Sequence, residues 1–229
     1  MVYASGVSSS SAQDASYAFG AHVEGVRRVI DHARFDSLLY LSSTRVYDGS
    51  PDTAESAALT VSPEDGHDVY RASKIAGETL CLALPAAAVR VARLSNVVGP
   101  TFESPLFVSD VLRQAARTGR AVLRTTRASA KDYITIDDAC RYLSAIARTG
   151  RARLYNVASG KNVENGAICD TLAACGVTIE IAGDAKVSIK RPIDVRRLQS
   201  EFGPPRDGLV AVLPALLDRF VAHASSAVG

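Results

Sequence analysis

The sequence offers little that would indicate a metal site, a disulfide framework, a membrane span or a nucleic-acid surface. Its four cysteines form no C-x-x-C pair and stand in apolar stretches, so we predict neither zinc nor a disulfide and expect buried free thiols. The 26 basic and 24 acidic residues are scattered and give a formal net charge of +2, which leaves no electrostatic footprint for nucleic acid. No apolar run approaches the ~20 residues of a membrane span, and the first arginine is Arg27. We therefore expect a cytoplasmic protein with neither a membrane nor a nucleic-acid partner.

Short apolar runs alternate with amphipathic stretches along the 229 residues. This alternation is typical of βαβ units, in which helices cover a parallel sheet. The predicted strands are 2–5, 37–43, 88–95 and 154–159, and the predicted helices between them are 13–33 and 69–84. The pattern changes after about residue 101, where we predict helices at 105–118, 137–149 and 163–174, short strands near 122, 131–136 and 177–181, and two C-terminal helices.

A tyrosine and a lysine lie four residues apart in the segment DVYRASKIAGETL, residues 68–80. Positions i and i+4 share one face of a helix, so Tyr70 and Lys74 can be neighbours. An ammonium beside a phenol favours the phenolate, which would make Tyr70 a usable acid or base near neutral pH. The pair alone is weak evidence, because an ordinary helix-face pair has the same spacing.

Two serines end the strand predicted at 37–43. Ser42 and Ser43 would stand at the carboxyl edge of the sheet, where open α/β sheets bind their ligands. A serine there could hydrogen-bond the same substrate oxygen as Tyr70. The alternative is that both hydroxyls only satisfy nearby backbone groups.

The order of five segments resembles the extended short-chain dehydrogenase/reductases, the NAD-dependent epimerase/dehydratase family that works mostly on nucleotide sugars. The resemblance runs from residue 2 to about 205. The segments are Ser-Ser…Val-Tyr (42–47), Tyr-x-x-x-Lys (70–74), Arg-x-x-Asn-x-x-Gly-Pro (93–100), Asp-Tyr-Ile-x-x-Asp-Asp (132–138) and Tyr-Asn-x-x-Ser (155–159). Each motif is short, but together they are specific.

The resemblance implies roles for the residues around Tyr70. Ser43 corresponds to the catalytic hydroxyl and Tyr70 to the acid/base. Lys74 corresponds to the residue that tunes Tyr70 and holds the nicotinamide ribose. Lys74 and Ser42 are accordingly assigned to binding of the cofactor, NAD or NADP, and no metal is implied.

Substrate-binding positions and two departures follow from the same resemblance. Asn96 matches a substrate-contacting position, while Lys131 and Arg191 match positions that hold the diphosphate of a nucleotide sugar. Lys131 replaces an arginine and lacks its bidentate fork. The 4,6-dehydratases of the family carry acidic residues directly after the catalytic hydroxyl, where this sequence has Thr44 and Arg45. We therefore expect an enzyme other than a 4,6-dehydratase.

The largest departure is at the front of the sequence. In the family, a strand like 2–5 is the fourth of the sheet, and three βα units with a Gly-x-x-Gly-x-x-Gly turn precede it. Here, Gly6 is the only glycine in residues 4–11. We expect a truncated Rossmann-like parallel sheet, from family strand 4 onward, with helices on its faces and a small C-terminal substrate lobe. Residues 1–100 and 153–159 would form the core of this single domain, and 101–152 and 160–229 the lobe.

Without the preceding strands, the segment Val2–Ser5 would form an exposed apolar edge. A second copy, a separately encoded front half, a rearranged local segment or an upstream segment would each cover such an edge. The family resemblance also implies a homodimer formed through the helices 13–33 and 69–84. Binding of NAD(P) by this chain alone is expected to be weak or absent.

Two functions remain open from the sequence. The first is an NAD(P)-linked epimerase or reductase that acts on a nucleotide sugar. The second is a degenerate relative that binds a sugar nucleotide or a protein partner and has lost redox turnover. The set Ser43, Tyr70, Lys74 and Asn96 favours the first, and the missing glycine turn favours the second.

Overall fold

The computed structural model describes residues 1–7, 14–85 and 89–226, which form two compact units. The first unit contains Met1–Ser95, Ala139–Ala158 and Ile193–Gly203, and the second contains Asn96–Asp138, Ser159–Pro192 and Pro204–Gly229. Segments 139–152 and 193–203, which the sequence analysis assigns to the lobe, thus group with the first unit. Residues 8–13, which include part of the expected front loop and the first residue of the helix predicted at 13–33, lie outside the described residues. So does residue 88, the first residue of the strand predicted at 88–95.

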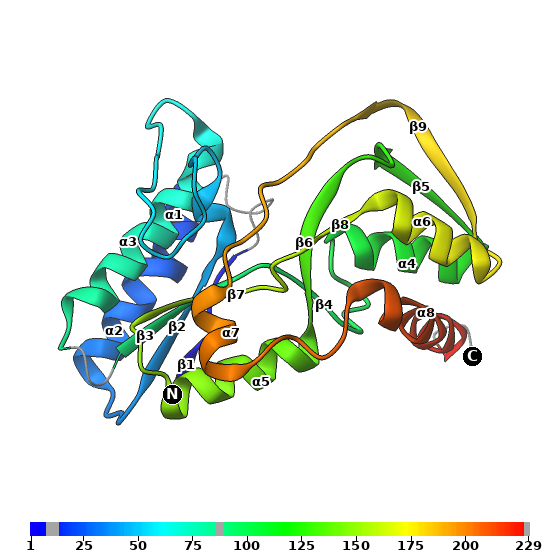
Figure 1. Ribbon diagram of the computed structural model, residues 1–229. Coiled ribbons are helices and arrows are strands. Elements are labelled where there is room, and N and C mark those ends of the chain that lie inside the picture. Colours follow the sequence, from blue (N-terminus) through cyan, green and yellow to red (C-terminus); the bar gives the residue numbers. More distant parts are fainter. Residues whose placement is uncertain (8–13, 86–88, 227–229) are drawn as a thin grey trace. The chain divides into compact units, whose positions relative to one another are not determined.

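A parallel sheet forms the centre of the first unit (Figure 1). Its strands are β1 (Val2–Tyr3), β2 (Leu38–Ser43), β3 (Val89–Leu94) and β7 (Leu154–Val157), in the order β1-β2-β3-β7. Strands of a parallel sheet are covered on both faces and therefore read as continuous apolar runs, and Leu38, Leu39 and Tyr40 have no exposed surface. The predicted Rossmann-like α/β class is confirmed. Among the described strands β1 pairs only with β2, and Val2 is 47% exposed at this edge.

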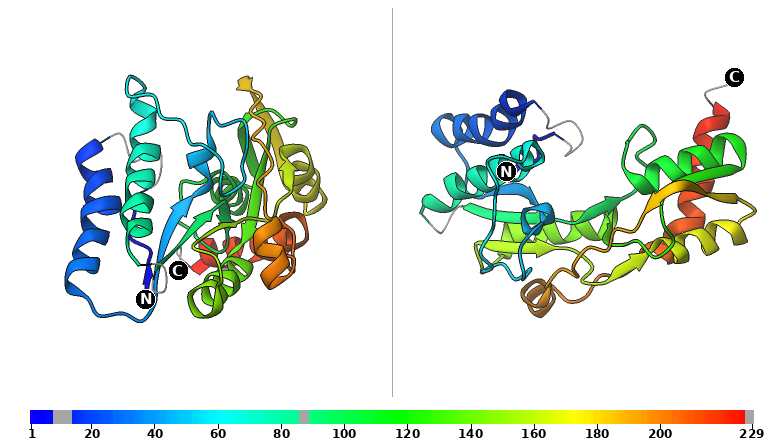
Figure 2. Two further views of the ribbon diagram at one scale, coloured as in Figure 1. Left: turned by 60° about the vertical axis from the view of Figure 1, so that its left-hand side comes forward. Right: turned by 90° about the horizontal axis from the view of Figure 1, so that it is seen from above.

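Helices lie on both faces of this sheet (Figure 2). One face carries α1 (Ala15–Phe19), a π-helical turn η1 (Gly20–Glu24), α2 (Gly25–His32) and α3 (Val69–Ala83), and the other carries α5 (Ile136–Thr149) and α7 (Arg196–Phe202). The helix predicted at 13–33 is therefore interrupted by a wider turn. Asp14 caps its first turn by accepting the N–H of Tyr17 at 3.1 Å. Helix α3 ends shortly before Pro85, which cannot continue a helix.

Helix α3 approaches the η1 turn closely at Gly77. A Cβ at Gly77 would clash with the hydroxyl of Tyr40 and lie 2.5 Å from the carbonyl oxygen of His22. We predict that Gly77→Ala lowers the free energy of unfolding in urea by about 1–3 kcal/mol, because added volume forces the packed elements apart. Gly20→Ala is the control, because its Cβ would meet nothing within 4 Å, and it should leave stability unchanged or raise it by up to about 1 kcal/mol. Equal effects of the two substitutions would contradict the prediction.

The described part of the second unit contains two small sheets and three helices. Strands β4 (Asn96–Val98), β6 (Ala130–Thr135) and β8 (Asn162–Glu164) pair in that order, and β5 (Arg120–Thr125) pairs in parallel with β9 (Thr178–Lys186). Helices α4 (Phe107–Thr118), α6 (Asn165–Ala174) and α8 (Leu209–Ser226) contribute Leu112, Leu172 and Leu213 to one apolar core. The three-residue strands β4 and β8 are absent from the sequence prediction, because so short a run carries no periodicity.

Helix α8 is long and apolar enough to cross a membrane, judged by length and composition alone. It is the one described helix with this property. Five of its side chains are buried in the core of the second unit: Leu209, Leu213, Leu216, Leu217 and Phe220. The apolar face of α8 therefore packs in the core of the second unit, as the apolar face of an amphipathic helix does.

The four cysteines are all unpaired, and they differ in exposure. Cys81 and Cys169 are buried, as predicted, whereas Cys140 and Cys175 are exposed. The prediction of buried thiols is wrong for these two, because Cys140 stands on an outward position of α5 and Cys175 follows the last residue of α6.

Candidate active site

Strand β2 carries Ser42 and Ser43 to the carboxyl edge of the first sheet. A 3₁₀ turn, η2 (Thr44–Tyr47), follows directly, and the Ser43 hydroxyl accepts the backbone N–H of Arg45 at 3.2 Å. This bond satisfies one of the free donors at the start of the turn. It also fixes the Ser43 hydroxyl at the edge where parallel sheets bind ligands.

Tyr70 lies in the first turn of α3. Burial raises the pKa of Tyr70 above its ordinary value, because a phenolate is poorly solvated there. The Ser43 hydroxyl opposes this rise in pKa, followed by the positive charge of Arg45. The structure thus brings together the two hydroxyls that the sequence analysis selects.

Lys74 is on the same helix, one turn after Tyr70, and only 5% of it is exposed. Its ammonium donates to the carbonyl of Leu41 in β2 at 3.0 Å and lies 5.4 Å from the ring centre of Tyr40. Burial lowers the pKa of Lys74 to about 8, and the nearby Glu78 opposes that shift. Arg45 supplies a positive charge that acts on the Tyr70 phenol, while the Lys74 ammonium is directed toward the β2 backbone.

Two features next to Lys74 fit a bound cofactor. The Ser42 hydroxyl is buried and has no hydrogen-bond partner among the described residues, which is costly unless a ligand or water satisfies it. At Gly6, after β1, a Cβ would lie 3.3 Å from the Lys74 nitrogen, so only a glycine leaves this backbone unobstructed beside the ammonium. These groups suit the hydroxyls of a nicotinamide ribose, which need donors and acceptors and close backbone approach.

The three predicted substrate-binding residues all lie in the second unit. The Asn96 amide donates to the carbonyl of Asp132 at 2.8 Å, directly beside Lys131 in the neighbouring strand β6. Lys131 lies 5.8 Å from the ring centre of Phe107. The exposed Arg191 follows Lys190, whose N–H donates to the carbonyl of Ala130 at 2.9 Å. The backbone therefore places Lys131 and Arg191 on adjoining segments.

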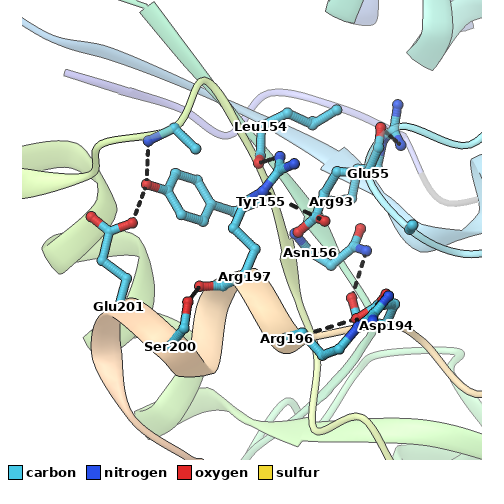
Figure 3. Close-up of polar contacts among 12 residues, drawn as sticks. Glu55, Arg93, Leu154, Tyr155, Asn156, Asp194, Arg196, Arg197, Ser200 and Glu201 are labelled. Atoms are coloured by element: carbon cyan, nitrogen blue, oxygen red, sulfur yellow. Dashed lines mark hydrogen bonds and ion pairs between the residues drawn. The ribbon is translucent and has the colours of Figure 1, made fainter.

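A buried charge network lies behind the sheet edge. The guanidinium of Arg93 makes an ion pair with Glu78 at 2.6 Å and donates to the Tyr47 hydroxyl at 2.7 Å. Glu55 accepts the backbone N–H of Asn156 at 3.1 Å (Figure 3). This network connects η2, α3, β3 and β7, and it therefore supports the turn that follows Ser43. Arg93 belongs to the motif Arg-x-x-Asn-x-x-Gly-Pro and Asn156 to the motif Tyr-Asn-x-x-Ser. The spacing of these motifs does not indicate that the two side chains are buried and hydrogen-bonded.

The profile of the "NAD dependent epimerase/dehydratase family" matches residues 1–158. The chain belongs to this family. The epimerase/dehydratase match includes the segment from β1 to β7 and therefore Ser43, Tyr70 and Lys74. The resemblance inferred from the motifs is confirmed.

Known epimerase/dehydratase relatives are longer than this chain. A dTDP-glucose 4,6-dehydratase from Streptomyces griseus is 27% identical over 203 residues, and the match covers 83% of this chain but 61% of the dehydratase. The solved structure of RMD from Pseudomonas aeruginosa, complexed with NADPH, has a TM-score of 0.78 at 21% identity. The match covers 96% of this chain and 80% of the RMD chain. The solved structure of UDP-glucuronic acid 4-epimerase from Bacillus cereus, in complex with UDP-glucuronic acid and NAD, has a TM-score of 0.70 at 16% identity. The match covers 92% of this chain and 70% of the epimerase chain. These two solved structures contain NADPH and NAD, respectively.

Proposed function

We propose that this chain catalyses NAD(P)-linked epimerisation or reduction of a nucleotide sugar. The observation that carries the proposal is the grouping of Ser43 and Tyr70 at the sheet edge with the buried Lys74, whose ammonium donates to the carbonyl of Leu41 in the strand that ends at Ser43. A nucleoside diphosphate sugar offers both a hydroxyl for this pair and a diphosphate for basic side chains. The family membership supports the reaction class.

In the oxidation of a sugar hydroxyl Tyr70 takes the proton and Ser43 holds the same oxygen by a hydrogen bond, and in a reduction Tyr70 returns a proton to that oxygen. A bound nicotinamide would accept the hydride from the sugar carbon in the first case and would donate it in the second. Arg45 favours the phenolate form of Tyr70 and so lowers the cost of removing that proton. Lys74 and Ser42 would hold the ribose hydroxyls. The Lys74 ammonium can donate hydrogen bonds to them, and the Ser42 hydroxyl can both donate and accept.

Dehydration of the sugar is not part of the proposal. The two residues after Ser43 are Thr44 and Arg45, and neither can remove a proton from a sugar carbon as a carboxylate can, because a guanidinium stays protonated. The Streptomyces griseus relative is named a dTDP-glucose 4,6-dehydratase, so the proposed difference in reaction rests on individual residues and not on the fold. Asn96, Lys131 and Arg191 would contact the substrate and its diphosphate.

The assembly and location of the protein are also proposals. We propose a homodimer formed through the segment α1–η1–α2 and α3, and a separate chain could also cover the exposed β1 edge at Val2. A cytoplasmic location fits the balanced charge and the buried apolar face of α8. A non-redox relative that binds a sugar nucleotide is the alternative.

Residues 1–229 alone should bind NADH weakly, with a dissociation constant well above micromolar. The reason is that the glycine-rich turn and helix N-terminus that normally receive a pyrophosphate are missing from this sequence. Calorimetric titration with NADH, followed by assays with UDP- and dTDP-sugars at saturating NAD, measures binding and turnover separately. Micromolar or tighter binding would contradict the first part. Sugar-nucleotide binding without turnover at any cofactor concentration would favour the non-redox alternative.

A further inference from the structure

His22 lies in the π-helical turn between α1 and α2, and none of its surface is exposed. Such turns are rare and occur often at functional sites, because they redirect a side chain that a regular helix would place elsewhere. Here the turn directs the imidazole toward α3. Its ring meets the Tyr70 ring edge-on, with the centres 5.5 Å apart and an interplanar angle of 87°.

Both nitrogens of His22 are engaged, and together the two bonds define its state. Nδ1 lies 2.8 Å from the Ser73 hydroxyl, which itself donates to the carbonyl of Tyr70 at 2.9 Å. The single hydroxyl proton of Ser73 is thus used, so Nδ1–H must be the donor to Ser73. Nε2 accepts the backbone N–H of Val7 at 3.2 Å. The network therefore assigns a neutral imidazole with its proton on Nδ1.

The same imidazole is in tight contact with the backbone beside Lys74. A Cβ at Gly6 would lie 3.1 Å from Nε2 of His22 and 3.3 Å from the Lys74 nitrogen. Protonation would remove the bond from Val7 and add a second positive charge near Lys74. Burial and the charge of Lys74 accordingly lower the pKa of His22 to about 4, so the ring stays neutral at pH 7.

We propose that His22 is a positioning residue for the Tyr70 and Lys74 site, because it ties the Gly6–Val7 backbone after β1 to the turn of α3 that carries Tyr70. The proposal rests on the proposed function of that site. An apolar ring of the same size would fill the space. It would leave the Val7 N–H without its acceptor and the Ser73 oxygen without the Nδ1–H donor, although Ser73 would keep its bond to the Tyr70 carbonyl. Both the Tyr70 ring and the backbone beside Lys74 would lose a fixed place.

Three substitutions separate the contributions of His22. In His22→Asn an amide near the Nδ1 position can still donate to Ser73, and in His22→Gln the amide reaches the Nε2 position and can accept from Val7. His22→Phe keeps only the ring. The control is His32→Asn, because His32 is exposed in the last turn of α2.

Turnover with a nucleotide sugar and supplied NAD(P) should show a split between kcat and KM. We expect kcat to fall about tenfold for each of the two His22 hydrogen bonds that is lost, while KM stays nearly unchanged. The fall should be largest in His22→Phe, which loses both hydrogen bonds. Asn and Gln should each recover part of the loss, and His32→Asn should match the wild type. Losses that only follow the melting temperature, with all three variants alike, would overturn the proposal.

Nuclear magnetic resonance tests the proposal without turnover. Nitrogen-15 spectra of the histidines should show His22 as the Nδ1–H form between pH 8 and 5, and carbon-13 spectra of labelled tyrosine should show the Tyr70 signal shifted in His22→Phe but not in His32→Asn. An Nε2–H or charged His22 at pH 7, or an unshifted Tyr70 signal, would overturn the positioning role. Absence of turnover in the wild type with these signals as expected would count against the proposed reaction alone.

Discussion

Tyr70→Phe should lower kcat by about 10²–10⁴-fold, the usual contribution of a general acid or base. The substitution removes the phenolic oxygen that meets Ser43 and keeps the ring that packs against His22. Substrate binding, measured by calorimetry with the sugar nucleotide, should change little. The measurement is steady-state turnover with the best sugar nucleotide and saturating NAD(P).

Two further variants make this result specific. Ser43→Ala should cost less than Tyr70→Phe, because it removes one hydrogen bond to an oxygen that Tyr70 still contacts. Tyr17→Phe is the matched control, because Tyr17 is 62% exposed in α1, and it should retain full activity. Full activity of Tyr70→Phe would show that Tyr70 and Lys74 are an ordinary helix-face pair, worth a few tenths of a kcal/mol.

Glu78→Leu should lower the free energy of unfolding by about 3–5 kcal/mol. The side chains of Glu78 and Arg93 are each 4% exposed, and two guanidinium nitrogens of Arg93 donate to the carboxylate, at 2.6 and 3.0 Å. Without Glu78 the guanidinium is left in a buried place without a counter-charge. Urea unfolding at pH 7, followed by circular dichroism, measures the change.

Two controls separate the buried charge from side-chain packing. The double variant Glu78→Leu with Arg93→Met should recover much of the loss, because it removes the uncompensated charge. Asp31→Asn should change stability by no more than about 1 kcal/mol, because its partner Arg27 is on the surface. A small effect of Glu78→Leu would contradict the prediction. The loss of Glu78 should also lower the pKa of Lys74 further, since Glu78 raises it.

Secondary structure with a long, regular apolar pattern was predictable from the sequence. Strands β2 and β3 and helices α3 and α4 lie within a few residues of the predicted ranges, because their periodicity is repeated several times. The π-helical turn η1 was not predictable from the sequence. One wider turn shifts the spacing of apolar residues along the helix by only one residue, which is too small a change to recognise. Strands β4 and β8 have three residues each and form only because β6 lies between them to supply hydrogen bonds.

The sequence by itself determined the family and the pair of residues on one helix face. Tyr70 and Lys74 share that face because the α-helix has 3.6 residues per turn, whatever surrounds it, and Ser43 follows a strand whose apolar run is plain. Tertiary structure decided which groups act on them. Arg45, His22 and Gly6 come from three other segments, and their distances to Tyr70 and Lys74 depend on how η2, the η1 turn and the end of β1 pack against α3. Spacing along a chain specifies neighbours within one element, whereas burial and charge at a site arise from several elements at once, and only their packing determines them.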